Sequence, residues 1–126
     1  MLRGSCLCGD IRFTATGPAR DPAACHCSQC RKQSGHHWAS VQVMDDALSV
    51  TGTPQWYAAS DSARRGFCPR CGSFLFWKGA ADPDTGIALG ALDGPTGLRL
   101  KRHIFTADKG DYYDITDDTP KQEQET

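Results

Sequence analysis

Seven cysteines in three close groups constrain this chain of 126 residues more than any other feature of its sequence. In chain order, the groups are a first pair, a triplet and a last pair: Cys6 and Cys8; Cys25, Cys27 and Cys30; Cys68 and Cys71. Thiols so close together can bind a soft metal ion such as zinc, which takes four protein ligands at structural sites and three at reactive ones. The triplet supplies one sulfur too few for a closed site, so the central question is what fills the fourth position.

The interpretation of these cysteines depends on the compartment in which the chain resides. Its first residues lack the apolar core of a secretory signal, and no run approaches the roughly 18 apolar residues of a membrane span. We therefore expect a soluble, cytoplasmic protein with no membrane partner. In a reducing compartment, clustered cysteines bind metal more often than they form disulfides, and the odd number argues further against a pure disulfide framework.

Composition and charge indicate one small globular domain. Hydrophobic residues make up 39% of the chain, a lean supply of core-forming side chains that metal sites often supplement. We assign residues 1–116 to a single domain and expect the polar segment 117–126 to be a disordered tail. The net charge is −1 without a basic stripe, which argues against a nucleic-acid partner. Nothing in the sequence indicates an oligomeric state.

Short apolar stretches separated by glycine and proline predict a mainly β domain with little helix. In residues 11–15, apolar and polar side chains alternate with the period of two that a half-buried strand requires. Further short strands are expected at 38–43, 48–50, 56–58, 65–67, 74–77, 87–92, 98–100 and 103–105. Residues 20–24 are interpreted as a connector, and residues 28–35 as one or two helical turns that Gly35 ends.

The spacing of the cysteines permits two ways of dividing them between metal ions. In one, Cys27 and Cys30 of the triplet join the last pair in a closed site of ribbon type, which leaves the other three thiols without a task. In the other, the first and last pairs form a closed site, and the triplet forms an open one. The first is the more ordinary arrangement by spacing alone, whereas the second uses all seven cysteines.

The residues around the cysteines carry a resemblance to a known family. The order Cys-x-Cys, then Cys-His-Cys-x-x-Cys-Arg-Lys, then Cys-Pro-x-Cys-Gly resembles the glutathione-dependent formaldehyde-activating enzymes, which share their domain with centromere protein V. The blocks that resemble the family signature are residues 4–9, 25–32, 68–73, 103–109 and 113–117. Together these blocks cover nearly the whole domain in family order.

This resemblance implies a β-tent fold, built of several small coiled antiparallel sheets, and two zinc ions per chain. It implies that a structural zinc is held by the first and last pairs, Cys6, Cys8, Cys68 and Cys71. It implies that a catalytic zinc is held by Cys25, Cys27 and Cys30. The reaction implied is that of a carbon–sulfur lyase, which joins glutathione and formaldehyde into S-hydroxymethylglutathione or cleaves that adduct. The partners implied are therefore a small thiol such as glutathione and an aldehyde.

The chemistry of three thiolates agrees with such a reaction. Three thiolates on Zn²⁺ leave a formal charge of −1, so the ion is a poorer Lewis acid than a tris-histidine zinc, whose bound water titrates near neutral pH. This argues against a hydrolase of the carbonic-anhydrase type. A soft, electron-rich site prefers sulfur as its fourth ligand, and a thiolate held there can add to an aldehyde carbonyl.

Polar side chains near the triplet each have two interpretations. His26, between two ligands, is a candidate catalytic residue that transfers the hydroxyl proton of the adduct, or else it turns away and caps a local carbonyl. His36 and His37 are candidate ligands or substrate contacts, or else solvated loop residues. Arg31 and Lys32 are candidates to contact a glutathione carboxylate, or else part of a solvated surface.

Other residues receive structural interpretations. We expect Trp38, Trp56 and Trp77 to pack in the core rather than to wall a pocket. His103 is given no role, and Asp117 with Asp118 is expected to belong to the solvated tail. Two further functions also fit the pattern: a non-catalytic, zinc-stabilised binding module, and a zinc or redox sensor whose triplet releases its metal on oxidation.

Overall fold

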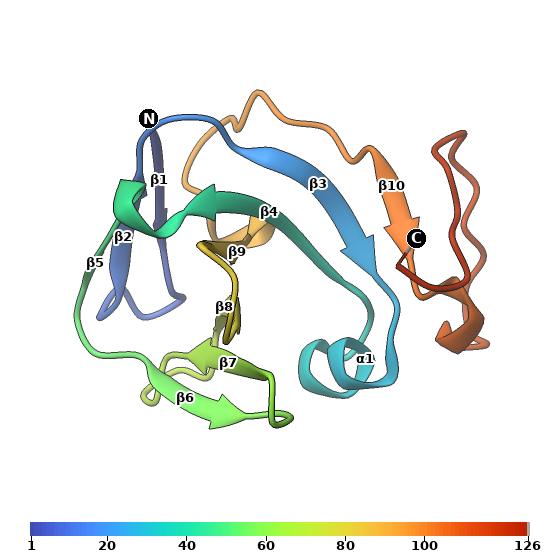
Figure 1. Ribbon diagram of the computed structural model, residues 1–126, viewed down its shortest axis with the longest axis horizontal. Helices are drawn as coiled ribbons and strands as arrows, with labels where there is room; N and C mark the ends of the chain where they lie inside the picture. The colour runs from blue at the N-terminus through green and yellow to red at the C-terminus, as the bar shows by residue number, and fades with distance from the viewer. Residues whose placement is uncertain (126) are drawn as a thin grey trace.

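The computed structural model describes residues 1–125, and it is mainly β with two sheets (Figure 1). The smaller sheet has the order β1 (Leu2–Ser5), β2 (Arg12–Ala15) and β5 (Leu48–Thr51). The larger has the order β10 (Arg102–Ile104), β3 (Arg20–Cys25), β4 (Trp38–Met44), β9 (Asp84–Ala88), β8 (Phe74–Gly79), β7 (Ala63–Phe67) and β6 (Gln55–Ala58). The predicted mainly β class is confirmed. All pairings of named strands are antiparallel except that of β10 with β3, which is parallel.

The smaller sheet buries one face of β2, as the alternation in the sequence predicts. Ile11, Phe13 and Ala15 are all buried, and β2 lies between β1 and β5. Phe13 lies opposite Gly4 of β1, and a Cβ atom at Gly4 would lie 2.2 Å from the Cζ atom of Phe13. Glycine is therefore required at this position, because the phenyl ring fills the space that a side chain would take.

The core lies where the two sheets meet. Phe13 of the smaller sheet contacts Phe76 of β8 edge to face, with 5.3 Å between ring centroids. Val41 and Ile87, which are paired in register on β4 and β9, are fully buried in the same cluster. Packing of these aromatic and aliphatic side chains in one cluster removes apolar surface from water, which stabilises the domain.

The predicted helical turn is confirmed as α1 (Ser28–Ser34). The Cys27 sulfur accepts a hydrogen bond from the Cys30 backbone N–H and so caps the helix at its N-terminus. Gly35 ends the helix in the left-handed conformation, at φ 86°, and donates its N–H to the Arg31 carbonyl. The other helical elements of the described chain are three short 3-10 turns, η1 (Asp45–Ala47), η2 (Leu89–Ala91) and η3 (Thr106–Asp108). No helix among residues 1–125 is both long and apolar enough to span a membrane.

Three local predictions were wrong. Residues 20–24, interpreted as a connector, belong to β3, which pairs with β4 across a bulge and with β10. The strand expected at 87–92 begins earlier and ends at Ala88, where η2 takes over. Residues 98–100 form no strand. Partners distant in sequence decide which short segments pair, so a local pattern does not reveal them.

The polar C-terminal segment also differs from the expectation of disorder, since residues 117–125 lie along β10 (Figure 1). His103 and Phe105 donate their backbone N–H groups to the carbonyls of Pro120 and Gln124, and Gln122 donates its N–H to the His103 carbonyl. Backbone hydrogen bonds, rather than apolar burial, thus hold this segment. Amino-acid composition reports on side chains and not on backbone hydrogen bonds, so it did not predict that this segment would be ordered.

Candidate metal centre

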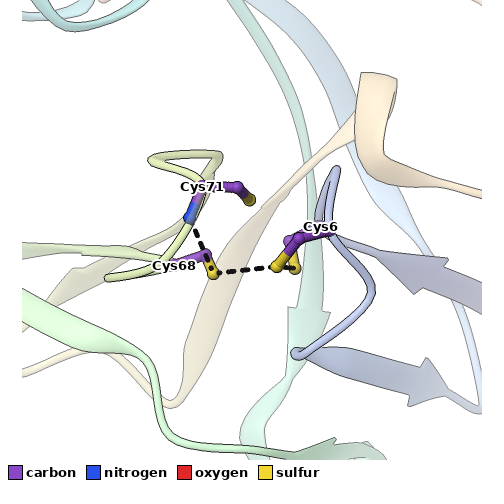
Figure 2. A group of neighbouring side chains, drawn as sticks. Cys6, Cys68 and Cys71 are labelled. Carbon is purple, nitrogen blue, oxygen red and sulfur yellow. Dashed lines mark hydrogen bonds between the residues drawn. The ribbon is translucent and has the colours of Figure 1, made fainter.

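Two groups of sulfur atoms come together in the described chain, and they are the groups of the second partition. The first and last pairs form a four-cysteine site, in which all four Sγ atoms lie within 4.8 Å of one another. Figure 2 shows Cys68 and Cys71, in the loop after β7, facing Cys6, in the loop after β1. This site therefore fastens the smaller sheet to the larger one.

The spacing within the four-cysteine site suits zinc. The Cys8 sulfur lies 3.6 Å from that of Cys6 and 3.7 Å from that of Cys68. Four sulfurs around Zn²⁺ at about 2.3 Å would lie about 3.8 Å apart in a regular tetrahedron. Backbone N–H groups of Ile11 and Cys71 donate to the sulfurs of Cys6 and Cys68, at 3.3 and 3.4 Å. Although burial acts to raise it, the pKa of the Cys6 thiol is lowered, with the hydrogen bond from Ile11 as the largest cause in that direction.

The triplet forms a second group beside the N-terminal end of α1. Cys25 ends β3, Cys27 caps α1 and Cys30 lies in its first turn, buried, and the three Sγ atoms lie within 4.8 Å of one another. No cysteine, histidine, aspartate or glutamate elsewhere in residues 1–125 adds a fourth donor to this group. The triplet therefore has the donor set of a three-ligand zinc site with one open position.

The electrostatics of the triplet favour a bound cation. A hydrogen bond with Cys27 is the largest cause that raises the pKa of the Cys25 thiol. Hydrogen bonds with Cys25 and Cys30 lower the pKa of the Cys27 thiol to about 2. The lowered pKa of Cys27 beside the raised pKa values of Cys25 and Cys30 reflects the repulsion between thiolates so close together. A divalent cation would allow all three to ionise, so the residues present fit zinc.

A cavity of about 390 Å³ opens beside the triplet. The side chains around it combine aromatic walls, hydroxyl and amide groups, one guanidinium and two carboxylates: Trp38, Trp77, Phe105, Ser40, Ser60, Ser62, Gln42, Arg65, Asp108 and Glu125. Trp38 stacks on Phe74 with ring centroids 4.0 Å apart, so it serves both the core and the cavity wall. Trp56 lies elsewhere, against Phe76.

His26 points away from this cavity and belongs to a chain of hydrogen bonds in which the two imidazoles are buried. Its Nε2 atom lies 2.9 Å from Nδ1 of His103, its Nδ1 atom contacts the Tyr113 hydroxyl, and Nε2 of His103 lies 2.8 Å from the Asp117 carboxylate. Neutral imidazoles satisfy every member if Tyr113 donates to His26, His26 to His103 and His103 to Asp117. Burial lowers the pKa of His26 to about 4, which agrees with a neutral ring.

This chain of hydrogen bonds changes the interpretation of three residues. His26 does not line the cavity, and its ring nitrogens contact Tyr113 and His103 rather than a local carbonyl. His103, which the sequence left without a role, is buried at its centre, and Asp117 is its acceptor rather than a residue of a free tail. The hydrogen bond from His103 also contributes to the lowered pKa of Asp117, after that from Thr119.

The other candidate residues lie away from the cavity. His36 is exposed and contacts Tyr113 edge to face, and His37 lines a different groove. Lys32 is exposed beside another groove, and Arg31 is absent from the cavity wall. The sequence did not point to Arg65 as a residue of the cavity. Its local signal is that Arg64 and Arg65 are consecutive in a strand, so that their side chains point to opposite faces and one of them faces inward.

Deleting residues 117–126 is expected to destabilise the protein. The deletion removes the Asp117 acceptor from buried His103 and the carbonyl acceptors of four backbone amides, those of His103, Phe105, Thr106 and Ala107, each of which would then need a new partner. We expect the thermal midpoint to fall by roughly 5–10 °C and the amides of His103 and Phe105 to exchange faster with solvent. An unchanged midpoint, with equally slow exchange of both amides, would restore the interpretation of a free tail.

The family model of the glutathione-dependent formaldehyde-activating enzymes matches residues 1–108 of this chain. The chain belongs to this family. It is 31% identical to a protein of Halomonas elongata named "Putative glutathione-dependent formaldehyde-activating enzyme", over 91% of this chain and 81% of that protein. It is 29% identical to an uncharacterized lyase of Schizosaccharomyces pombe, over 92% and 86% of the two chains. The family suggested by the cysteine motifs is therefore confirmed.

A solved structure supports the fold. The crystal structure of a Rhodobacter sphaeroides protein superposes with a TM-score of 0.62 at 22% identity, over 75% of this chain and 90% of that one. At this identity the likeness speaks for the fold alone. The likeness agrees with the mainly β fold of this chain.

Proposed function

We propose that this protein is a zinc-dependent carbon–sulfur lyase that forms or cleaves an adduct of a small thiol and an aldehyde at the triplet. The observation that carries the proposal is the triplet itself, which has three sulfur donors, no fourth donor among residues 1–125, and a cavity at its side. The names of the family and of its relatives support glutathione and formaldehyde as the thiol and the aldehyde. The four-cysteine site would hold a second, structural zinc.

The residues of the cavity would place the two reactants. Zinc bound by the triplet would supply a soft site that holds an incoming thiol as its thiolate. Trp38 and Trp77 wall the cavity and restrict water, while Ser40 and Gln42 offer donors to an aldehyde oxygen. The new bond joins sulfur to the carbonyl carbon; the carbonyl π electrons move to oxygen, which takes a proton from solvent. Cleavage runs through the same steps in reverse.

Cobalt substitution tests whether the triplet accepts a substrate thiol. Glutathione added to the cobalt-loaded protein is expected to strengthen the thiolate-to-cobalt absorption, because a fourth sulfur joins the open site. S-methylglutathione, which has no free thiol, is the matched control and should leave the spectrum unchanged. Exchange between glutathione and its formaldehyde adduct, followed by NMR with ¹³C-labelled formaldehyde, should also be faster with the zinc protein than in buffer.

Two outcomes would overturn the proposal. A spectrum that glutathione leaves unchanged would indicate a closed triplet and favour a zinc-stabilised binding module. An equal response to glutathione and S-methylglutathione would indicate peptide binding away from the metal.

A further inference from the structure

Arg65 is a buried cation without a carboxylate partner. Its side chain belongs to β7, near the middle of the larger sheet's β6–β7–β8 portion, and the residue is only 4% exposed. Within residues 1–125, no carboxylate lies within 4.0 Å of its guanidinium. Arginine is rarely buried unless it is paired with an anion, because the desolvation of a lone charge is costly.

The surroundings of the guanidinium direct it toward the triplet. Its Nη1 atom donates to the Cys30 sulfur at 3.5 Å and to the Gln33 side-chain oxygen at 3.2 Å. The Cζ atom of the guanidinium lies 5.3 Å from the centre of the Phe74 ring. Its Nε atom is buried and has no hydrogen-bond partner among the described residues. Among the residues that the structure describes, the only group of ionisable side chains to which the guanidinium donates a hydrogen bond is therefore the triplet, through Cys30.

The charge of Arg65 is opposite to that of a zinc-loaded triplet. Three thiolates with Zn²⁺ carry a net charge of −1. The guanidinium of Arg65 would bring the summed charge of the metal, its three ligands and this side chain to zero. An incoming thiolate would then change the total charge from 0 to −1, instead of from −1 to −2. Without Arg65, a second negative charge would have to enter a buried site that is already anionic, which low-dielectric surroundings oppose strongly.

We propose that Arg65 is the counter-cation of the triplet and makes it selective for an anionic fourth ligand, a thiolate, over a neutral one. This inference rests on the proposed function and adds a residue to it. Arg65 acts through Cys30 and through the charge that it places beside the site, so it is a positioning residue. Its neighbour Arg64 is exposed and lies over the Trp56 ring at 4.3 Å, which makes Arg64 a matched control on the same strand.

The test compares anionic and neutral ligands on the cobalt-loaded, full-length protein at one fixed pH. The probes are 2-mercaptoethanol, which binds as a thiolate and has no carboxylate to meet Arg65 directly, and imidazole, which binds as a neutral nitrogen ligand. Arg65→Gln is expected to weaken thiolate binding roughly tenfold or more and to change imidazole binding only slightly. Arg65→Lys keeps the charge and should retain most of the thiolate affinity, and Arg64→Gln should behave like the unchanged protein.

Each outcome decides the proposal. Equal weakening of both probes by Arg65→Gln, or no weakening of either, overturns it. If the unchanged protein binds neither probe, the proposed function fails, and Arg65 is then judged by zinc affinity in competition with a chromophoric chelator. There, Arg65→Gln should lower the affinity of the triplet and not that of the four-cysteine site, whereas equal affinities overturn the inference. If Arg65→Gln does not fold, Arg65→Lys is compared with Arg64→Gln instead. Arg65→Lys keeps the charge, so a roughly tenfold loss of thiolate affinity in this variant, with imidazole affinity unchanged, would contradict a role for the charge.

Discussion

Replacing Cys68 by serine is expected to unfold the domain. Cys68 is fully buried, and its sulfur is one of four that join the loop after β1 to the loop after β7. Zinc binding contributes about 10–16 kcal/mol in small structural sites, whereas a domain has only about 5–15 kcal/mol of net stability. Loss of one thiolate should therefore remove most or all of the native state, which far-UV circular dichroism and urea unfolding would measure.

Removal of the metal from the unchanged protein provides the comparison for this variant. A strong chelator should produce the same unfolded spectrum if the four-cysteine site holds a structural zinc. Cys71→Ser should behave like Cys68→Ser, because Cys71 belongs to the same site. A Cys68→Ser protein that unfolds at the same urea concentration as the unchanged chain would refute a structural metal at these four sulfurs.

Replacing Cys27 by serine is expected to give a folded protein that binds one zinc ion and has no activity. Cys27 caps α1, and serine is among the best residues at that position because its hydroxyl accepts the same hydrogen bond. The substitution thus removes a metal ligand while it preserves the local hydrogen bond. Metal analysis, circular dichroism and the ¹³C exchange assay would measure the three parts of this expectation.

Comparison of Cys27→Ser with Cys68→Ser separates the two metal roles. We expect the zinc content to fall from two ions to one in Cys27→Ser, with a thermal midpoint near that of the unchanged protein. Cys30→Ser should lose activity in the same way, although it also removes the Arg65 contact. If Cys27→Ser unfolds as completely as Cys68→Ser, the triplet is a structural element and the proposed catalytic role fails.

Local sequence patterns determined a large part of this protein. The alternation of Phe13 and Ala15 with polar neighbours predicted a buried strand face, because side chains in a strand point to opposite sides. The helical turn of α1 and its end at Gly35 were also visible, since glycine readily adopts the left-handed conformation that ends a helix. The cysteine motifs indicated the family, because their spacing and flanking residues lie close together in sequence.

Only the tertiary structure decided which sulfurs meet and what surrounds them. Spacing allowed two divisions of the seven thiols, and the fold brought Cys6 and Cys8 to Cys68 across about sixty residues of chain. Arg65 of β7 reaches Cys30 of α1, and His103 of β10 reaches both His26, just before α1, and Asp117 of the C-terminal segment. Buried charged and polar groups need partners, and the assembled fold decides which groups are buried together. Residues that are neighbours in sequence do not contain this information.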